Sequence, residues 1–131
     1  MTSQRREIET FTIDAVPSEL PFSSATRAGD LVHISGQIGH VPGEMRLVEG
    51  GMEAEARQAL DYLGQSLAAA GSSYDRVLKC TVFFADFKDF KAFNEIYRTY
   101  FSTYLPARSG IEVQGLALGA RIEIECIALA G

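Results

Sequence analysis

The sequence has few of the residues that usually build metal, redox or nucleophilic sites. Its two cysteines, Cys80 and Cys126, lie far apart and form no C-x-x-C pair. Metal ligation and redox motifs are therefore unsupported, and two buried thiols in a reducing compartment are the simpler interpretation. Its two histidines, His33 and His40, stand neither near a serine elbow nor at metal-ligand spacing, so we expect a structural or surface role for each. The chain calls for no metal and no cofactor.

Basic residues are also scarce and scattered. Lysine and arginine number 12 against 17 aspartate and glutamate residues, which gives a net charge of −5. A nucleic-acid-binding surface needs a basic patch or stripe, and only the short tail "QRRE" clusters its arginines. The N-terminus "MTSQRREIET" is polar where a signal peptide needs an apolar stretch, and no apolar run approaches a membrane span in length. We expect a cytoplasmic protein with no nucleic-acid or membrane partner.

The length and the apolar spacing predict a single α+β domain over residues 1–131. With 131 residues and 47% hydrophobic composition, the chain can bury a core of its own. The expected strands lie at 7–13, in a hairpin over 23–37 that turns at "AGD", at 76–86, and in a closing hairpin over 110–114 and 120–130. The expected helices lie at 52–70 and after Asp86 or Asp89. The glycine-rich segment 36–51 is expected to be a loop with at most a short strand.

Side-chain periodicity predicts which faces of these elements are buried. The first helix is expected to bury Ala56, Ala59, Leu60, Leu63, Leu67 and Ala70, with Gly71 at its C-terminal cap. The central strand is expected to bury Leu78, Cys80, Val82 and Phe84. The second helix is expected to bury an aromatic stripe of Phe90, Phe93, Ile96 or Tyr97, Tyr100 and Phe101. Aromatic residues at helical spacing favour a packing role over a cofactor site.

Right-handed crossovers predict that both helices pack on one face of the sheet. The other face then has no cover, yet it also carries apolar side chains. In the last strand, Glu123, Ile127 and Leu129 point away from Ile122 and Ile124. Because an exposed apolar face is usually buried against another subunit, we expect an oligomer with polar groups such as Glu123 near its interface.

Two charged residues are candidates for chemistry. Arg108 lies where an irregular segment becomes a strand, and no acid lies within three residues of it. Its planar guanidinium suits an anion clamp, and the alternative is an ordinary surface arginine or a structural ion pair. Glu123 shares a strand face with Ile127 and Leu129, so partial desolvation would raise its proton affinity and suit a general acid or base. The alternative for the segment "IEIE" is a solvated strand face.

Three segments in a fixed order resemble the Rid family of reactive-intermediate deaminases, also described as L-PSP endoribonucleases or translation inhibitors. They are "SGQIG" at 35–39, "EAEARQALDYLGQSLAAAGSSYDRVLKCTVFFADFKDFKAFNEIY" at 53–97, and "LPARSGIEV" to "RIEIECIA" over 105–128. The resemblance covers about residues 20–130 and implies a chorismate-mutase-like α+β fold, a mixed six-stranded sheet with two helices on one face. It implies a homotrimer with sites in the clefts between subunits. It also implies cofactor-free hydrolysis of enamines and imines, such as 2-aminoacrylate and its 2-imino tautomers, to 2-keto acids and ammonia.

The resemblance implies roles for five residues of this chain. Arg108 matches the family's carboxylate-binding arginine, and Glu123 matches the acid that positions or activates the attacking water. Ser35 and Gly36 match residues that line the site, and Asn94 matches an asparagine of the second helix. Collapse of the carbinolamine formed by that water would release ammonia.

Two positions depart from the family's pattern. Gly110 stands where many members carry a cysteine, so a reactive thiol is excluded there. Phe22 stands in the place of a common tyrosine, so a phenol hydrogen bond is absent and a more apolar pocket is expected. These departures leave open a larger substrate, such as 2-aminomuconate or an aminoacrylate from pyrimidine breakdown.

Two other classes of function stay open. One is a noncatalytic regulator that binds a small carboxylate, and the other, the weakest, is a ribonuclease or translation inhibitor. Simple hairpin register also raises a geometric problem, because it places Glu123 opposite about Glu112 and roughly 13 Å along a strand from Arg108. A site with both residues would need strand curvature, a water-sized gap or a neighbouring subunit.

Overall fold

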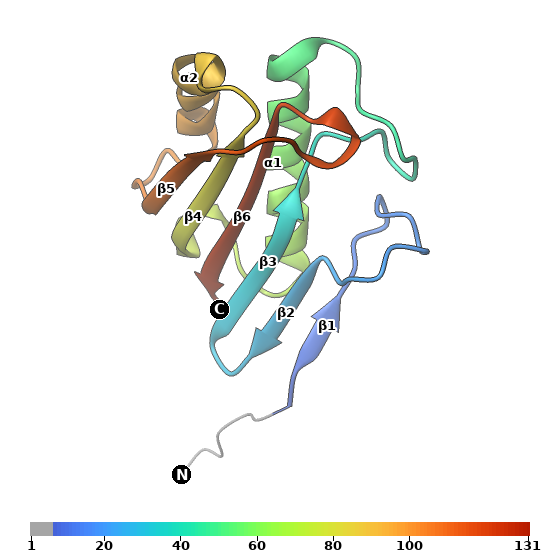
Figure 1. Cartoon of the computed structure of the whole chain (residues 1–131). Helices are drawn as coiled ribbons and strands as arrows, with labels where there is room; N and C mark the ends of the chain where they lie inside the picture. The colour runs from blue at the N-terminus through green and yellow to red at the C-terminus, as the bar shows by residue number, and fades with distance from the viewer. Residues whose placement is uncertain (1–6) are drawn as a thin grey trace.

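The computed structural model describes residues 7–131, which form a six-stranded sheet with two helices on one face (Figure 1). The strands are β1 Glu9–Phe11, β2 Ala25–Ala28, β3 Leu31–Gln37, β4 Val77–Phe84, β5 Ala107–Glu112 and β6 Ile122–Leu129. The helices are α1 Gly51–Ala69 and α2 Phe90–Tyr100, with 3-10 turns at Tyr74–Arg76, Phe87–Asp89 and Ala117–Gly119. In this part of the chain, no helix has the length and apolar character to cross a membrane. The predicted α+β fold is confirmed.

The order of the strands differs from the predicted one at the end of the chain. The sheet has the order β1-β2-β3-β6-β4-β5, so β6 lies between β3 and β4. β6 runs antiparallel to both neighbours, whereas β5 pairs with β4 and runs parallel to it. The predicted hairpin between the last two strands is therefore wrong. Helix α2 connects β4 to β5, which lies at the edge of the sheet and runs parallel to β4. The segment after β5 then crosses β4, so that β6 pairs with β4 on its other side.

The N-terminal part of the sheet follows the prediction more closely. β2 and β3 form the expected hairpin, in which Ala28 pairs with Leu31 across a two-residue turn. Gly29 in that turn has a φ of 60°, which glycine adopts without steric cost. β1 is shorter than the predicted strand over 7–13. The glycine-rich loop after β3 contains a single bridge, between His40 and Leu47.

Helix α1 buries the predicted face against the sheet. Its buried apolar residues are Met52, Ala56, Ala59, Leu60, Tyr62, Leu63 and Leu67. Gly71 follows the helix with a φ of 85°, the left-handed conformation typical of a residue just beyond a helix end. The prediction of this helix is confirmed to within one residue at each end.

Helix α2 is partly predicted by its aromatic spacing. Phe93, Ile96 and Tyr97 are buried, but Phe90 is 42% exposed, so its place in the buried stripe was wrongly predicted. Tyr100 is also only partly buried, and its hydroxyl donates a hydrogen bond of 2.9 Å to the Asp61 carboxylate on α1. Asp86 caps the 3-10 turn that precedes the helix, since its carboxylate accepts a hydrogen bond of 2.8 Å from the Lys88 backbone N–H.

A partly buried ion pair fixes the start of β6. The guanidinium of Arg121 donates to both carboxylate oxygens of Asp89 at 3.1 and 2.8 Å, and Asp89 is 6% exposed. The Arg121 backbone N–H donates to the Glu55 carboxylate at 2.8 Å. Helix α1 and the 3-10 turn before α2 therefore both hold Arg121, which lies two positions before Glu123.

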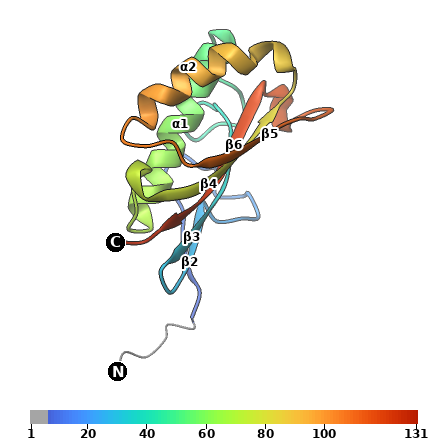
Figure 2. The same cartoon turned by 90° about the vertical axis from the view of Figure 1, so that its left-hand side faces the viewer.

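Figure 2 shows both helices on one side of the sheet, and alternation along each strand directs successive side chains to opposite faces. The face under the helices carries the core residues of the two central strands: Cys80, Val82, Phe84, Ile122, Ile124, Cys126 and Ala128. Both cysteines are buried and free, as predicted. Leu78 was wrongly placed in this core, because a register irregularity between Val77 and Lys79 leaves it 44% exposed.

The second face has no helix over it and is partly apolar. Glu123 pairs with Phe83, and Phe83 pairs with Ile111, so these three side chains form one row on this face. Ile111 is 45% exposed and Leu31, near the other end of the sheet, is 43% exposed. The prediction that the helices leave an apolar face uncovered is confirmed, whereas the oligomer inferred from it stays a prediction.

Candidate active site

Glu123 lies on β6, on the face of the sheet that the helices leave uncovered. β3 bulges opposite this strand, with a register shift between Ile34 and Gln37. The bulge brings Gly36 directly against the Glu123 side chain. A Cβ atom at residue 36 would overlap Glu123 Oε2, so glycine is the residue that leaves room for this carboxylate.

The surroundings of Glu123 make its carboxylate a stronger base. The side chain is half-buried, and burial raises the pKa of the Glu123 carboxyl. The negative charge of Glu125, two residues further on the same strand face, raises this pKa further. A desolvated carboxylate beside another acid is suited to accept a proton from a bound water.

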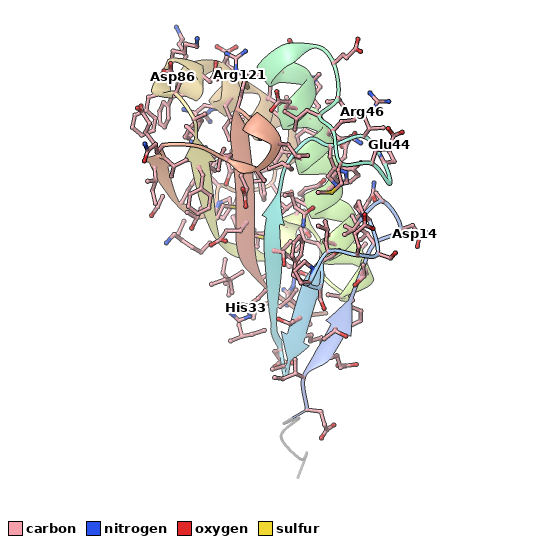
Figure 3. All side chains as sticks on the ribbon, turned by 45° about the vertical axis from the view of Figure 1, so that its right-hand side comes forward. Asp14, His33, Glu44, Arg46, Asp86 and Arg121 are labelled. Atoms are coloured by element: carbon pink, nitrogen blue, oxygen red, sulfur yellow. The ribbon has the colours of Figure 1, made fainter. Side chains whose placement is uncertain are left out.

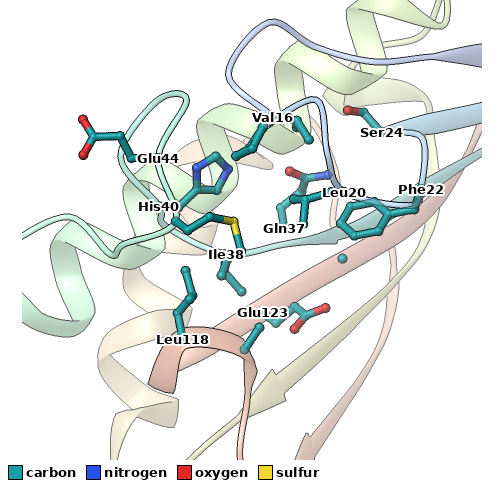
Figure 4. Close-up of a pocket in the computed structure, with 14 residues that line it drawn as sticks. Val16, Leu20, Phe22, Ser24, Gln37, Ile38, His40, Glu44, Leu118 and Glu123 are labelled. Atoms are coloured by element: carbon teal, nitrogen blue, oxygen red, sulfur yellow. The ribbon is translucent and has the colours of Figure 1, made fainter.

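Glu123 lines a pocket of about 260 Å³, which we call the Glu123 pocket (Figure 4). Three segments enclose it: the β1–β2 connection, the loop after β3, and the 3-10 turn before β6. Its apolar lining consists of Val16, Pro17, Leu20, Phe22, Gly36, Ile38, Met45, Ala117 and Leu118, and its polar lining of Ser24, Gln37, His40, Glu44 and Glu123. Most of the wall is therefore apolar, with the catalytic candidate as one of few charged groups.

Arg108 lies on β5 and points to the face that the helices cover. Its Nη2 atom donates a hydrogen bond of 2.6 Å to Asn94 Oδ1 on α2. Its guanidinium carbon also lies 4.7 Å from the ring centroid of Tyr97 and 5.6 Å from those of Phe90 and Phe93. Cation–π contacts and one amide hydrogen bond thus hold the side chain in a defined position.

The Arg108 side chain lines a second hollow, of about 290 Å³, which we call the Arg108 pocket. Its lining residues are Phe90, Asn94, Tyr97, Arg98, Leu105, Pro106, Arg108 and Gly110. Half-burial lowers the pKa of the Arg108 guanidinium, although the nearby Tyr97 and Cys80 oppose that shift. Among residues 7–131, no carboxylate lies within ion-pair distance of Arg108. The pocket therefore presents a cation without an internal counter-charge.

The sheet separates these two pockets within one chain. Arg108 pairs with Cys80, which pairs with Cys126, and these cysteines belong to the core under the helices. Glu123 pairs with Phe83, whose side chain points to the opposite face. The earlier estimate of roughly 13 Å between Arg108 and Glu123 assumed the wrong strand pairing. The structure places β4 between the two strands and puts the two side chains on opposite faces.

The other predicted site residues divide between the two pockets. Phe22 and Gly36 line the Glu123 pocket, and Asn94 and Gly110 line the Arg108 pocket. A Cβ atom at Gly110 would lie 3.5 Å from the nearest ring atoms of its neighbours, so a small side chain would fit there. Ser35 lines neither pocket. Its hydroxyl donates a hydrogen bond of 2.6 Å to the Ser23 carbonyl and so ties the bulge to the preceding loop.

Sequence reasoning missed several residues that line the Glu123 pocket. His40 was expected to have a structural or surface role, but it is 9% exposed and lies in the pocket wall. Leu118 also lines the pocket, with a left-handed φ of 60° that is uncommon for a non-glycine residue. The flanking glycines of "GLALG" marked a turn, but they gave no indication that this turn would fold over Glu123.

The raised pKa of Glu123 leads to a prediction about stability. Since the folded state raises this pKa, ionisation of Glu123 opposes folding, and stability is lost as the pH rises through the unfolded and then the folded pKa. Glu123→Gln should therefore raise the free energy of unfolding at pH 7. The stability difference between this variant and the parent should shrink as the pH falls from the pKa of Glu123 in the folded state to its pKa of about 4.3 in the unfolded chain. Urea unfolding at fixed protein concentration measures both effects, with the exposed-loop variant Glu49→Gln as control. A variant less stable than the parent at pH 7 would contradict this account.

Comparisons with known proteins agree with both the fold and the motifs. The family model described as endoribonuclease L-PSP matches residues 12–130. The 2-iminobutanoate/2-iminopropanoate deaminase of Mus musculus is 48% identical over 111 residues, which cover 85% of this chain and 82% of the mouse protein. The crystal structure of YyfA from Yersinia pestis, a Rid-family protein of unknown function, matches with 34% sequence identity and a TM-score of 0.88. The match covers 95% of this chain and 100% of the YyfA chain. E. coli TdcF, solved with bound serine, has 29% identity and a TM-score of 0.86, over 94% of this chain and 99% of its own. The chain therefore belongs to the endoribonuclease L-PSP family, which is the Rid family that its motifs resemble.

Proposed function

We propose that this chain is a cofactor-independent deaminase that hydrolyses 2-imino acids and enamines of the 2-aminoacrylate type to 2-keto acids and ammonia. The observation that carries the proposal is the state of Arg108, a half-buried cation that has no acidic partner in residues 7–131. The carboxylate of a small 2-imino acid supplies that partner. The mouse relative is named for substrates of this kind, and E. coli TdcF holds serine, which is also a small carboxylate.

We also propose that the working site combines Arg108 of one subunit with Glu123 of another in a homotrimer. Arg108 and Glu123 lie on opposite faces of the sheet, so one chain alone does not bring them to a single substrate. The uncovered face carries exposed apolar side chains such as Ile111 and Leu31, whose burial would stabilise an assembly. In the assembly, residues 1–131 act as one Rid-like domain in the cytoplasm.

The proposed reaction uses orientation and one acid–base group. Arg108, held by Asn94 and the ring of Tyr97, binds the substrate carboxylate and presents the imine carbon. Glu123 takes a proton from a water whose oxygen bonds to that carbon, while the C=N electron pair moves to nitrogen. Glu123 then returns the proton to nitrogen, which gives the neutral carbinolamine. In the collapse, Glu123 accepts the hydroxyl proton of the carbinolamine and passes it to the amino group, while the C=O bond forms and the C–N bond breaks. The products are a 2-keto acid and ammonia, and no oxidation or reduction occurs.

The sites also fit a second candidate, a noncatalytic regulator that binds a small carboxylate. The bound serine of E. coli TdcF is the observation that favours it. Calorimetry that shows 2-ketobutyrate binding, with no deamination of any imine, would support this candidate. A ribonuclease, which the family description names, is the weakest fit to a chain with a net charge of −5.

The deaminase proposal makes a direct kinetic prediction. Arg108→Ala and Glu123→Gln should each lower kcat/KM for 2-iminopropanoate by at least about a hundredfold, because one removes the anchor and the other removes the base. Arg57→Ala, at an exposed ion pair with Glu53, serves as the control and should stay near the parent rate. The substrate is made in situ by an amino-acid oxidase, and its decay is followed by absorbance. Unchanged turnover in the Arg108→Ala variant would contradict the assignment of Arg108 as the substrate anchor.

Gly36 provides a test of carboxylate position that leaves both charged groups in place. Gly36→Ala should displace the Glu123 carboxylate and lower kcat by about a hundredfold, since a misplacement of about 1 Å has that effect. Gly115→Ala is a matched control, because a Cβ atom there meets nothing within 4 Å and its φ is not in the left-handed range. Equal rates for the two variants would show that the close contact between Gly36 and Glu123 has no part in the reaction.

A further inference from the structure

The Glu123 pocket contains a titratable side chain that the reaction above does not use. His40 lies in the loop after β3, is 9% exposed and forms part of the pocket wall. Figure 4 shows His40 and Glu123 on different sides of the pocket, with Ile38 between them. A buried histidine in a largely apolar pocket, opposite a catalytic candidate, is positioned to contact the substrate.

Local contacts fix both the ring and its tautomer. His40 Nδ1 lies 2.9 Å from the Val41 carbonyl oxygen, which can only accept, so Nδ1 carries the hydrogen. The ring packs on Tyr62 with a centroid separation of 4.6 Å, and the Tyr62 hydroxyl donates to the His40 carbonyl at 2.8 Å. Gln58 supports that hydroxyl with a hydrogen bond of 2.7 Å. Nε2 of the neutral ring is then left as a lone-pair acceptor with no partner in residues 7–131.

The charges around the pocket restrict what Nε2 can bind. None of the residues that line the pocket is lysine or arginine, and Glu123 contributes a negative charge. The second acid, Glu44, is already paired with Arg46 at 2.6 Å, and Figure 3 shows the two side chains next to each other. A second carboxylate on the substrate would therefore meet no free cation here, whereas a neutral N–H or O–H group would find an acceptor.

The Glu123 pocket is also larger than the smallest proposed substrate, 2-iminopropanoate, requires. A volume of about 260 Å³ is many times the roughly 10–15 Å³ of such space that one water molecule needs. The side chain of 2-iminopropanoate is one methyl group, which leaves most of this space empty. Ile38, Met45 and Leu118 provide an apolar wall that suits a methylene chain.

From these contacts we infer that His40 Nε2 accepts a hydrogen bond from the end of the substrate side chain. The preferred substrates are then 2-imino acids with side chains longer than methyl that end in a neutral amide or hydroxyl donor. This inference rests on the proposed deaminase function and names the substrate class of that same site. His40 thereby acts as a specificity-determining residue, because a substrate without the donor covers Nε2 and leaves its lone pair without a hydrogen bond.

Three imines of nearly equal size test the inference. Those formed in situ from asparagine, leucine and aspartate end in an amide, an apolar group and a carboxylate. The parent protein should show a kcat/KM for the amide imine about tenfold above that for the leucine imine, with the carboxylate imine the poorest. A preference for the leucine or aspartate imine would overturn the inference. The ratio is taken within one preparation, so it does not depend on how much of a variant folds.

Two conservative variants separate substrate binding from a structural role. His40→Asn keeps a donor near the Nδ1 position and loses Nε2, so the amide preference should fall to about one. His40→Gln places an amide oxygen near the Nε2 position and should retain most of the preference. The exposed histidine variant His33→Asn should keep the parent ratio. The reverse pattern, with preference kept by Asn and lost by Gln, would assign His40 to loop support alone and overturn the inference.

Failure of the proposed function is distinguishable from failure of this inference. No acceleration of any imine, 2-iminopropanoate included, would overturn both. Acceleration of 2-iminopropanoate with no amide preference would overturn the substrate class alone and leave the deaminase proposal standing.

Discussion

Side-chain alternation across the central strands is the constraint on which the rest of this structure depends. It directs Arg108 into the helix-covered side and Glu123 to the uncovered side, with β4 between their strands. Neither residue can change face without a one-residue slip of its strand, which would expose core residues such as Ile124 and Cys126. Burial of the core therefore also holds the two candidate groups apart. A site that uses both must be built from more than one copy of the chain.

Arg108 and Glu123 are each held in a defined position in which burial of their charge opposes folding. Arg108 is half-buried without an acidic partner, and Asn94 and the ring of Tyr97 satisfy only part of its guanidinium. Glu123 is desolvated beside Glu125 and depends on the missing side chain of Gly36 for its place. A bound carboxylate would pair with the charge of Arg108, and a proton taken from water would neutralise the charge of Glu123. In the proposed reaction, the same features that weaken folding favour the binding of an anionic substrate and the transfer of a proton.

Local patterns predicted much of the fold, and long-range pairing limited the rest. The apolar spacing of α1 and the "AGD" turn are local signals, and both elements formed as predicted. The closing hairpin was wrong because the glycines of "GLALG" indicate a turn but not which strand edge the chain reaches next. Arg108 and Glu123 were identified from motifs, whereas their opposite faces depend on that strand order. His40 and Leu118 were missed because loops distant in sequence bring them to the pocket wall.

Mixed oligomers test the central claim most directly. Arg108→Ala and Glu123→Gln chains are combined in equal amounts, dissociated in urea and reassembled, and turnover of 2-iminopropanoate is measured. If each site takes Arg108 from one subunit and Glu123 from its neighbour, about a quarter of the sites in random trimers recover both groups. The account predicts activity near that fraction of the parent value, from two chains that are each nearly inactive alone. Mixed trimers of confirmed composition with no recovered activity would contradict it.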